Sequence, residues 1–251
     1  IRSPKGKWFE IVRTDEMDFI ITSAKRVEGK HVDLNNPRQS NPLIFKAWGK
    51  TTGQMHRLAK SYPYWQKYGQ SGETLSPISD WKDELNHFLN WAQEDEIREK
   101  WGNLSKKIGV LPINRDSYGL IHNDLHPNNF LVNEDNSISV IDFDVCLFHF
   151  YIKDLAIALF FANWIGNPGK GKSKDDYLTT FLQNYIKGYE SENDLDYLWY
   201  KQLPTFLKHH QILLYIVFSN EWKLKNPWQS TTLEKWKNQI LSDDPVLKVL
   251  I

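Results

Sequence analysis

Three oxygen-bearing side chains stand close together in the middle of the chain. Asp124 and Asn129 lie five residues apart within His122-Asn123-Asp124-Leu125-His126-Pro127-Asn128-Asn129, and Asp142 follows within Ile141-Asp142-Phe143-Asp144. Short apolar runs flank both segments, so strand ends can bring two carboxylates and one amide to a single point. Phosphoryl transfer needs such a set, because one group must orient the attacking hydroxyl while magnesium neutralises the phosphate oxygens.

The chemistry of the three groups suggests how the roles divide. Mg²⁺ prefers hard oxygen ligands, usually one or two from the protein, with phosphate and water completing the set. Asn129 and Asp142 therefore suit the metal, and Asp124 is left for the substrate hydroxyl. For Asp124 or Asn129 alone, a hydrogen bond to loop backbone is the simpler interpretation. Their joint spacing with Asp142 favours chemistry.

Zinc is the competing hypothesis for the same loop. His122 and His126 could ligate zinc together with Asp124. Alternate positions in an irregular loop are a weak indication of a metal site, so magnesium is favoured.

The two segments resemble the aminoglycoside phosphotransferase and choline kinase superfamily. Those enzymes share a protein-kinase-like fold and carry a loop of the form His-Gly-Asp-Leu-His-Pro-Gly-Asn, followed by a hydrophobic-Asp-Phe-acidic segment. The later Asp154-Leu155-Ala156 also matches. The resemblance implies catalysis by Asp124, metal binding by Asn129 and Asp142, and support of the catalytic loop by Asp154.

Further roles are implied by the same resemblance. Asp144 would be an auxiliary acidic group, and His122 and His126 would brace the loop. Residues 22–28 resemble the hinge between the lobes, whose backbone meets the adenine ring, and residues 54–58 resemble the helix that follows the hinge. The candidate nucleotide contacts are Thr22, Ser23, Ala24, Lys25, Leu131 and Ile141.

The sequence departs from the family pattern in two ways. Asn123 and Asn128 stand where glycine is usual, which a left-handed turn conformation would accommodate. Neither a glycine-rich phosphate loop nor a strand lysine precedes Trp8. We therefore expect the chain to open midway through the N-terminal lobe, as a fragment of a longer protein or with a truncated lobe.

Periodicity predicts the elements that position these residues. Residues 7–12 and 18–22 are rich in aromatic and β-branched residues and predict two strands, followed by a linker over 25–38. Helices are predicted over 42–62, 79–101, 155–164, 177–189, 195–222 and 231–241, with a loop over 64–76. A small patch of three strands is predicted at 119–121, 130–132 and 138–141.

Together these elements predict an α+β, protein-kinase-like fold. Residues 1–28 would form a strand pair and hinge of a partial N-terminal lobe. Residues 29–251 would form a mostly helical C-terminal lobe that carries the small catalytic β patch and the metal site.

Composition limits the partners. The 251 residues contain 31 Lys and Arg against 31 Asp and Glu, so no global field gathers nucleic acid or an anionic membrane. The single cysteine, Cys146, permits no internal disulfide, and the longest apolar runs are shorter than the roughly 20 residues that span a bilayer. We expect a cytoplasmic protein whose partners are a nucleotide and a small hydroxylated substrate.

Several other residues have simpler structural interpretations. For the pair His209-His210, packing or surface placement is expected, and for His149 and Tyr151 a core contact is as plausible as a substrate contact. Nothing cationic near Cys146 suggests a reactive thiolate. The Trp-rich C-terminal helices are most simply core and lobe surface, although aromatic walls also bind sugars and cations.

The leading functional hypothesis is an ATP-dependent kinase of a small hydroxylated molecule such as an aminoglycoside, choline, a sugar or an amino alcohol. Its cofactors would be Mg²⁺ and ATP, with GTP as the alternative donor. The short span from Asp142 to Asp154 leaves no room for a long activation segment, so a protein Ser/Thr kinase ranks second. A catalytically silent pseudokinase is the rival from another class, because the phosphate loop and lysine are not seen.

Overall fold

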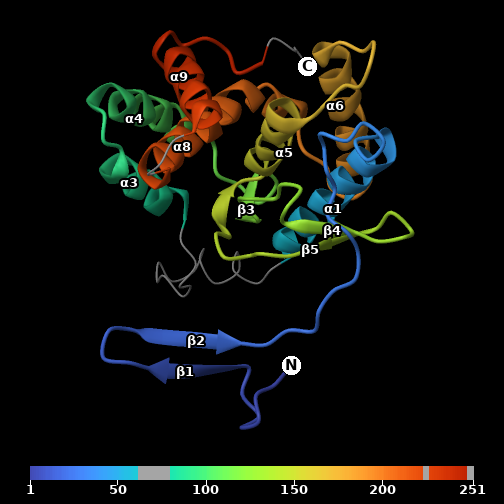
Figure 1. The fold of residues 1–251 in the computed structure, drawn as a ribbon, viewed down its shortest axis with the longest axis vertical. Helices are drawn as coiled ribbons and strands as arrows, with labels where there is room; N and C mark the ends of the chain where they lie inside the picture. The colour runs from blue at the N-terminus through green and yellow to red at the C-terminus, as the bar shows by residue number, and fades with distance from the viewer. Residues whose placement is uncertain (62–79, 223–225, 248–251) are drawn as a thin grey trace.

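The computed structural model describes residues 1–61, 80–222 and 226–247 (Figure 1). The chain opens with the predicted strand pair, in which β1 (Phe9–Arg13) runs antiparallel to β2 (Asp18–Thr22). This hairpin stands apart from the helical body in Figure 1. An extended segment connects the two, and Lys30 pairs with Val132 through backbone hydrogen bonds of 3.0 and 2.8 Å. The division of the chain at residue 28 stays a prediction.

Helices form the body of the molecule. α1 (Pro42–Ser61) begins where the Asn41 side chain accepts hydrogen bonds from the backbone of Leu43 and Ile44, at 3.0 and 3.3 Å. The later helices are α3 (Trp81–Trp91), α4 (Asp95–Gly109), α5 (Ile152–Ile165), α6 (Lys174–Glu190), α7 (Tyr197–Tyr200), α8 (Leu203–Glu221) and α9 (Pro227–Leu241).

Two of the predicted long helices are each divided. The one predicted over 79–101 is interrupted after α3, because Ala92 adopts an extended conformation and α4 restarts at Asp95. The one predicted over 195–222 is broken between α7 and α8. Pro204 has no backbone N–H to donate, so it fits only in the first turn of α8. The loop predicted over 64–76 lies outside the described residues.

The predicted three-strand patch is instead two separate ladders. β3 (Tyr118–Ile121) pairs antiparallel with β6 (Leu147–Phe150), and β4 (Phe130–Val132) pairs antiparallel with β5 (Ile138–Val140). The strand β6 was not predicted. All four of its residues are buried, so it lacks the alternation of apolar and polar residues that marks a half-buried strand.

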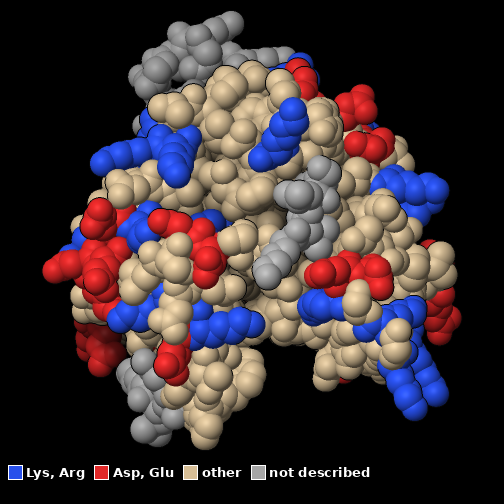
Figure 2. All heavy atoms as spheres, turned by 90° about the horizontal axis from the view of Figure 1, so that it is seen from above, with Lys and Arg blue, Asp and Glu red and all other residues tan. Residues whose placement is uncertain are grey.

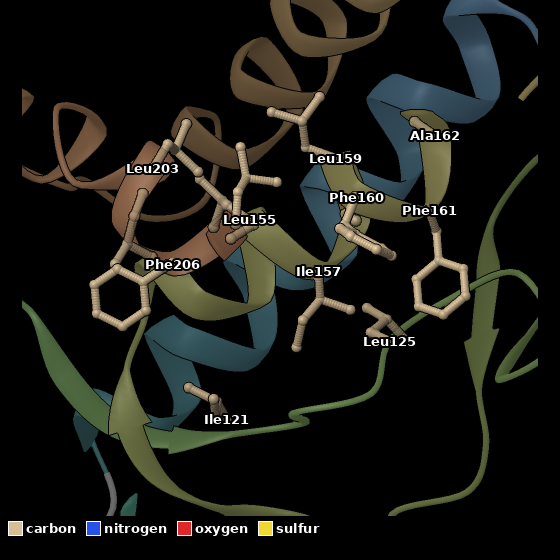
Figure 3. Packing of buried hydrophobic residues seen from close by; sticks show 14 of the residues in the cluster. Ile121, Leu125, Leu155, Ile157, Leu159, Phe160, Phe161, Ala162, Leu203 and Phe206 are labelled. Atoms are coloured by element: carbon tan, nitrogen blue, oxygen red, sulfur yellow. The ribbon is translucent and has the colours of Figure 1, made fainter. Parts of the chain in front are cut away.

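The core is built around α5, in which every residue from Ile152 to Ala162 is buried. In Figure 3 the side chains of Ile121 and Leu125 point toward this helix. They are only 2% and 0% exposed and stand on either side of residues 122–124. Apolar packing therefore anchors both ends of the segment that carries Asp124.

Charged residues of both signs share the surface. On the face shown in Figure 2, Lys and Arg lie among Asp and Glu instead of gathering in one field, in keeping with the 31 residues of each sign. Among the described helices, none is both long and apolar enough to cross a membrane.

Three histidines are part of the core. His149 is fully buried, and His209 and His210 are each 2% exposed, which confirms packing as their role. Burial lowers the pKa of each ring well below its usual value, and the nearby Lys153 ammonium adds to the effect. Tyr151 is likewise buried. The folded protein therefore holds these rings neutral.

We predict that the buried histidines make the protein acid-sensitive. Below about pH 6.5 the histidines of the unfolded chain bind protons that the buried rings of the folded chain do not. As the pH decreases, the free energy of unfolding therefore decreases by up to about 1.4 kcal/mol per pH unit for each ring. His210→Phe should reduce this slope by one such increment, because neither His210 nitrogen has a partner in the described structure. Urea unfolding between pH 7.5 and 5.5 measures it. The control is His87→Phe at an exposed position of α3, and equal slopes for the two variants would contradict the prediction.

The backbones of α1 and α6 approach each other closely. A Cβ atom at Gly49 of α1 would lie 1.9 Å from the Tyr185 carbonyl oxygen, and one at Gly188 of α6 would lie 2.0 Å from the Lys46 carbonyl oxygen. Both distances are far below van der Waals contact, so only glycine allows this approach. The contact holds α1 against the helical body.

We predict that Gly49→Ala lowers the free energy of unfolding by at least about 1–3 kcal/mol, because the added methyl group forces the two helices apart. Gly102→Ala is the matched control in α4. Its Cβ would meet nothing closer than Leu89 Cδ1 at 3.8 Å, so the helix-propensity gain of about 1 kcal/mol should appear instead. Urea unfolding of both variants distinguishes the outcomes. Similar losses would show that the α1–α6 contact is not tight.

Candidate active site

A buried carboxylate of α5 holds the loop between β3 and β4. Asp154 has no exposed surface and accepts backbone hydrogen bonds from His122 at 3.0 Å and Asn123 at 2.8 Å. Its Oδ2 also lies 3.1 Å from Nε2 of His56 on α1, and Nδ1 of His56 lies 2.8 Å from the Tyr189 hydroxyl on α6. Asp154 thus joins the loop to α5 and α1, and His56 extends the network to α6.

The charge state of this network follows from its hydrogen bonds. Burial alone would raise the pKa of the Asp154 carboxyl, but the hydrogen bonds from His56 and from the loop backbone outweigh it and hold this pKa below its usual value. Burial lowers the pKa of His56. A neutral His56 can therefore donate from Nε2 to Asp154 and accept at Nδ1 from the Tyr189 hydroxyl.

Asn129 is oriented by Asp124. The side-chain Nδ2 of Asn129 donates to the Asp124 backbone carbonyl at 2.9 Å and to Asp124 Oδ2 at 2.8 Å. Because the amide nitrogen is engaged in this way, the amide oxygen is turned away from Asp124. Within the described chain this oxygen accepts no hydrogen bond, so it is available as a neutral ligand.

Asp142 is brought to the same place by backbone pairing. The Ile141 amide donates to the Asn129 carbonyl at 3.0 Å, and Nε2 of His122 lies 3.1 Å from the Ile141 carbonyl oxygen. Asp142 itself has a φ of +62°, which is uncommon for a residue other than glycine and marks local strain. In the part of the chain that the structure describes, no hydrogen bond or ion pair engages its carboxylate.

Backbone and side-chain hydrogen bonds connect the segments that carry the three predicted residues. Asp124 contacts Asn129 directly, and Asn129 is hydrogen-bonded to the residue before Asp142. The side-chain oxygens of Asn129 and Asp142, which have no partner among the described residues, are hard donors of the kind that Mg²⁺ prefers. Their assignment to metal binding, and that of Asp124 to catalysis, stays a prediction.

The two histidines of the loop contact neighbouring segments, and their bracing role stays a prediction. His122 is 2% exposed and contacts Ile141 through its ring. Nε2 of His126 lies 3.4 Å from Asp124 Oδ2, and its ring packs at 4.5 Å on Phe161 of α5. Among residues 1–61, 80–222 and 226–247, these two rings and Asp124 form no cluster of possible metal ligands. The zinc hypothesis is therefore not supported.

The remaining predicted residues lie at the edge of this arrangement. Asp144 is exposed and makes no hydrogen bond or ion pair with any described residue. Burial, aided by the charges of Asp154 and Asp144, raises the pKa of the Cys146 thiol to about 12, so no thiolate forms at neutral pH.

The hinge segment is exposed. Thr22, Ser23, Ala24 and Lys25 lie on the surface, while Leu131 and Ile141 are half-buried. Lys25 lines a surface hollow together with the segment 26–30 and residues of the β4–β5 turn. Nucleotide binding by these residues stays a prediction.

Three polar residues of the site were missed from sequence. His56, Glu84 and Lys153 are buried, at 0%, 8% and 0% exposure. The sequence contains an indication of the buried position of Lys153, because Lys153 and Asp154 interrupt an otherwise apolar run. Glu84 occupies a core position of α3, and only the tertiary fold shows that its partners come from α5 and the loop.

Comparison with known proteins places this site in a family. The model of the phosphotransferase enzyme family, APH, matches residues 14–201. An amicoumacin kinase of Bacillus subtilis (strain 168) is 29% identical over 204 residues, which cover 78% of this chain and 56% of that protein. The chain thus spans little more than half the length of this curated relative.

Solved structures agree with this result. The amicoumacin kinase hAmiN, in complex with AMP-PNP, Ca²⁺ and Ami, has a TM-score of 0.86 and 26% identity, over 100% of this chain and 73% of that one. A microcompartment-associated aminopropanol kinase shares the fold, with a TM-score of 0.70 and 19% identity over 96% of this chain and 72% of the other. These likenesses confirm the predicted kinase-like α+β fold. Because the family match covers most of the chain and includes Asp124, Asn129 and Asp142, the chain belongs to the APH phosphotransferase enzyme family.

Proposed function

We propose that the protein transfers the γ-phosphoryl group of ATP to a hydroxyl group of a small molecule. The observation that supports this most directly is the hydrogen bond from Asn129 to Asp124, with the free carboxylate of Asp142 next to Asn129 along the backbone pairing. Phosphoryl transfer requires a proton acceptor close to oxygen ligands for a metal ion, and these hydrogen bonds support such an arrangement.

Asp124 is suited to orient the acceptor hydroxyl. Its side chain is 35% exposed, and the Asn129 amide engages Oδ2 at 2.8 Å. The other oxygen has no hydrogen bond among the described residues and can accept the proton of the attacking hydroxyl. The amide and the Asp124 backbone together fix the direction in which this carboxylate points.

Asn129 and Asp142 are suited to hold Mg²⁺ with the nucleotide. A bound divalent cation would neutralise the negative charge on the phosphate oxygens. The relative hAmiN was solved with AMP-PNP and Ca²⁺, which supports an adenine nucleotide and a divalent metal as partners here. ATP is therefore favoured over GTP.

The connection after Asp142 supports a small acceptor. Between Asp142 and Asp154 the chain forms a short loop, the strand β6 and the start of α5. A long activation segment of the kind that protein kinases use has no place there. A small molecule is therefore favoured over a protein as the acceptor.

A row of aromatic rings that begins at His126 bears on the kind of acceptor. From His126 the rings continue through Phe161 to Trp164, at centroid distances of 4.5 and 5.8 Å, and then to Trp228, which is 56% exposed and parallel to Trp164 within 9°. Such a surface suits an acceptor with a planar or apolar part. Since two relatives are amicoumacin kinases, amicoumacin is the first acceptor to test.

We predict that Asp124→Ala lowers kcat by about 10²–10⁴-fold, the range expected for loss of a positioned proton acceptor. ADP release with Mg²⁺, measured against a panel of hydroxyl compounds that includes amicoumacin, tests this. The control is Asp175→Ala, which removes an exposed carboxylate from the first turn of α6. Unchanged turnover in Asp124→Ala would contradict the catalytic role. No turnover by the parent with any acceptor would favour a silent binding module.

A separate prediction concerns the metal. Asp142→Asn keeps the shape of the side chain and the tolerance for positive φ, but it removes the charge. The Mg²⁺ concentration for half-maximal activity should rise by about tenfold or more, because one of at most two protein ligands loses its charge. Asp175→Asn, which neutralises an exposed carboxylate in the first turn of α6, is the control and should change this concentration much less. The same Mg²⁺ dependence in both variants would remove Asp142 from the metal site.

A further inference from the structure

The residue before Asp124 has an unusual conformation. Asn123 has a φ of +66°, in the left-handed region that disfavours most side chains. Its backbone amide donates to Asp154 Oδ1 at 2.8 Å. Glycine would adopt this conformation without strain, so the side chain of asparagine must have another reason to be there.

The Asn123 side chain ties the loop to two other elements. Its Nδ2 donates to Oε1 of Glu84 on α3 at 2.8 Å and to the Val145 carbonyl oxygen at 3.3 Å. Val145 lies in the turn that follows Asp142. One amide therefore links the backbone beside the proton acceptor, the segment beside the metal ligand, and a helix of the lobe.

Glu84 is itself held by a buried ion pair. The Lys153 ammonium, which has no exposed surface, donates to Glu84 Oε2, and Nε2 of His149 lies 4.0 Å from the same oxygen. Neither charge can be exposed to water without disturbing the packing of α5, so the pair is fixed in place. The Oε1 atom of Glu84 is therefore a rigid acceptor.

A metal centre is the other interpretation of this cluster. Glu84, His149 and His209 each offer a ligand atom, and these atoms lie within 4.8 Å of one another. The Lys153 ammonium already occupies the Glu84 carboxylate, however, and it would repel a divalent cation. The cluster is better suited to anchor a side chain than to bind a metal ion.

We propose that Asn123 and Glu84 are positioning residues for Asp124. The Glu84–Lys153 pair holds the Asn123 amide, and Asn123 in turn fixes the backbone conformation that directs the Asp124 carboxylate. The expected effect of these two residues on turnover rests on the phosphotransferase function proposed above. Their expected effect on the conformation of the loop is independent of that function.

The first test removes only the side chain of Asn123. Asn123→Gly keeps the left-handed conformation without strain and should leave the protein folded, with kcat reduced by about 10–100-fold and the KM for ATP little changed. Asn136→Gly is the matched control, because Asn136 has a φ of +63° in the exposed β4–β5 turn. A kcat within about twofold of the parent in Asn123→Gly would overturn the proposal.

Hydrogen exchange distinguishes failure of this proposal from failure of the kinase function. The His126 and Asn129 amides donate within the loop, at 2.9 and 2.8 Å. Both should exchange faster in Asn123→Gly and not in Asn136→Gly, whether or not the parent turns over ATP. Unaltered exchange in Asn123→Gly would overturn the positioning role, while faster exchange with an inactive parent would leave it standing and refute only the kinase function.

The second test isolates the acceptor oxygen of residue 84. Glu84→Gln with Lys153→Met and Glu84→Met with Lys153→Met both remove the two buried charges, but only the first pair keeps an oxygen for the Asn123 amide. We expect the double variant with Gln at position 84 to retain the parent kcat within about threefold. The double variant with Met at position 84 should have the same kcat as Asn123→Gly, and adding Asn123→Gly to it should lower kcat no further. Equal kcat in the two pairs, with only the melting temperature altered, would mean that Glu84 has a structural role alone.

Discussion

The hydrogen bonds to the Asp154 carboxylate are the constraint on which the site depends. They satisfy two consecutive backbone amides of the loop, at 3.0 and 2.8 Å, and the His56 ring, inside a core where water cannot replace them. A buried donor left without a partner costs about 1–3 kcal/mol. Another conformation of the loop would leave the His122 and Asn123 amides and the His56 ring without their hydrogen-bond acceptor. The fold therefore stabilises one conformation of the loop, and this conformation determines the position of the Asp124 carboxylate.

The same logic extends to the groups proposed to bind metal. The Asn129 amide nitrogen donates to Asp124. The positive φ of Asp142 follows directly after Ile141, whose amide donates to the Asn129 carbonyl and whose carbonyl oxygen lies 3.1 Å from Nε2 of the His122 ring. If Asn129 and Asp142 bind metal as proposed, these contacts orient them in advance, so little reorganisation would be needed during the reaction. The strain at Asp142 is offset by the packing and hydrogen bonds of the surrounding strands.

Local chemistry was predictable from the sequence, and long-range partnership was not. The spacing of Asp124 and Asn129 was enough to predict that their side chains lie close together, and Asn41-Pro42 predicted the start of α1. That Asp142 joins them at a metal site stays a prediction. The strand β6 was not predicted, because a fully buried strand has no alternation of apolar and polar residues. The ion pair between Glu84 and Lys153 was not predicted for a different reason. A charged residue at a core position shows that it needs a partner, but the sequence does not say which one the fold will bring.

The hairpin at the start of the chain has a consequence for how the protein behaves at high concentration. Apolar side chains are exposed along it, with Trp8 at 66%, Ile11 at 48% and Ile20 at 71%. A two-stranded ribbon is only marginally stable by itself, and among the described residues no further strand pairs with the outer edge of β1 or β2. Such an edge is a template for adding strands from another molecule. Concentrated samples of these 251 residues are therefore expected to associate through the ribbon, whereas the backbone of Lys30 is already paired with Val132 of β4.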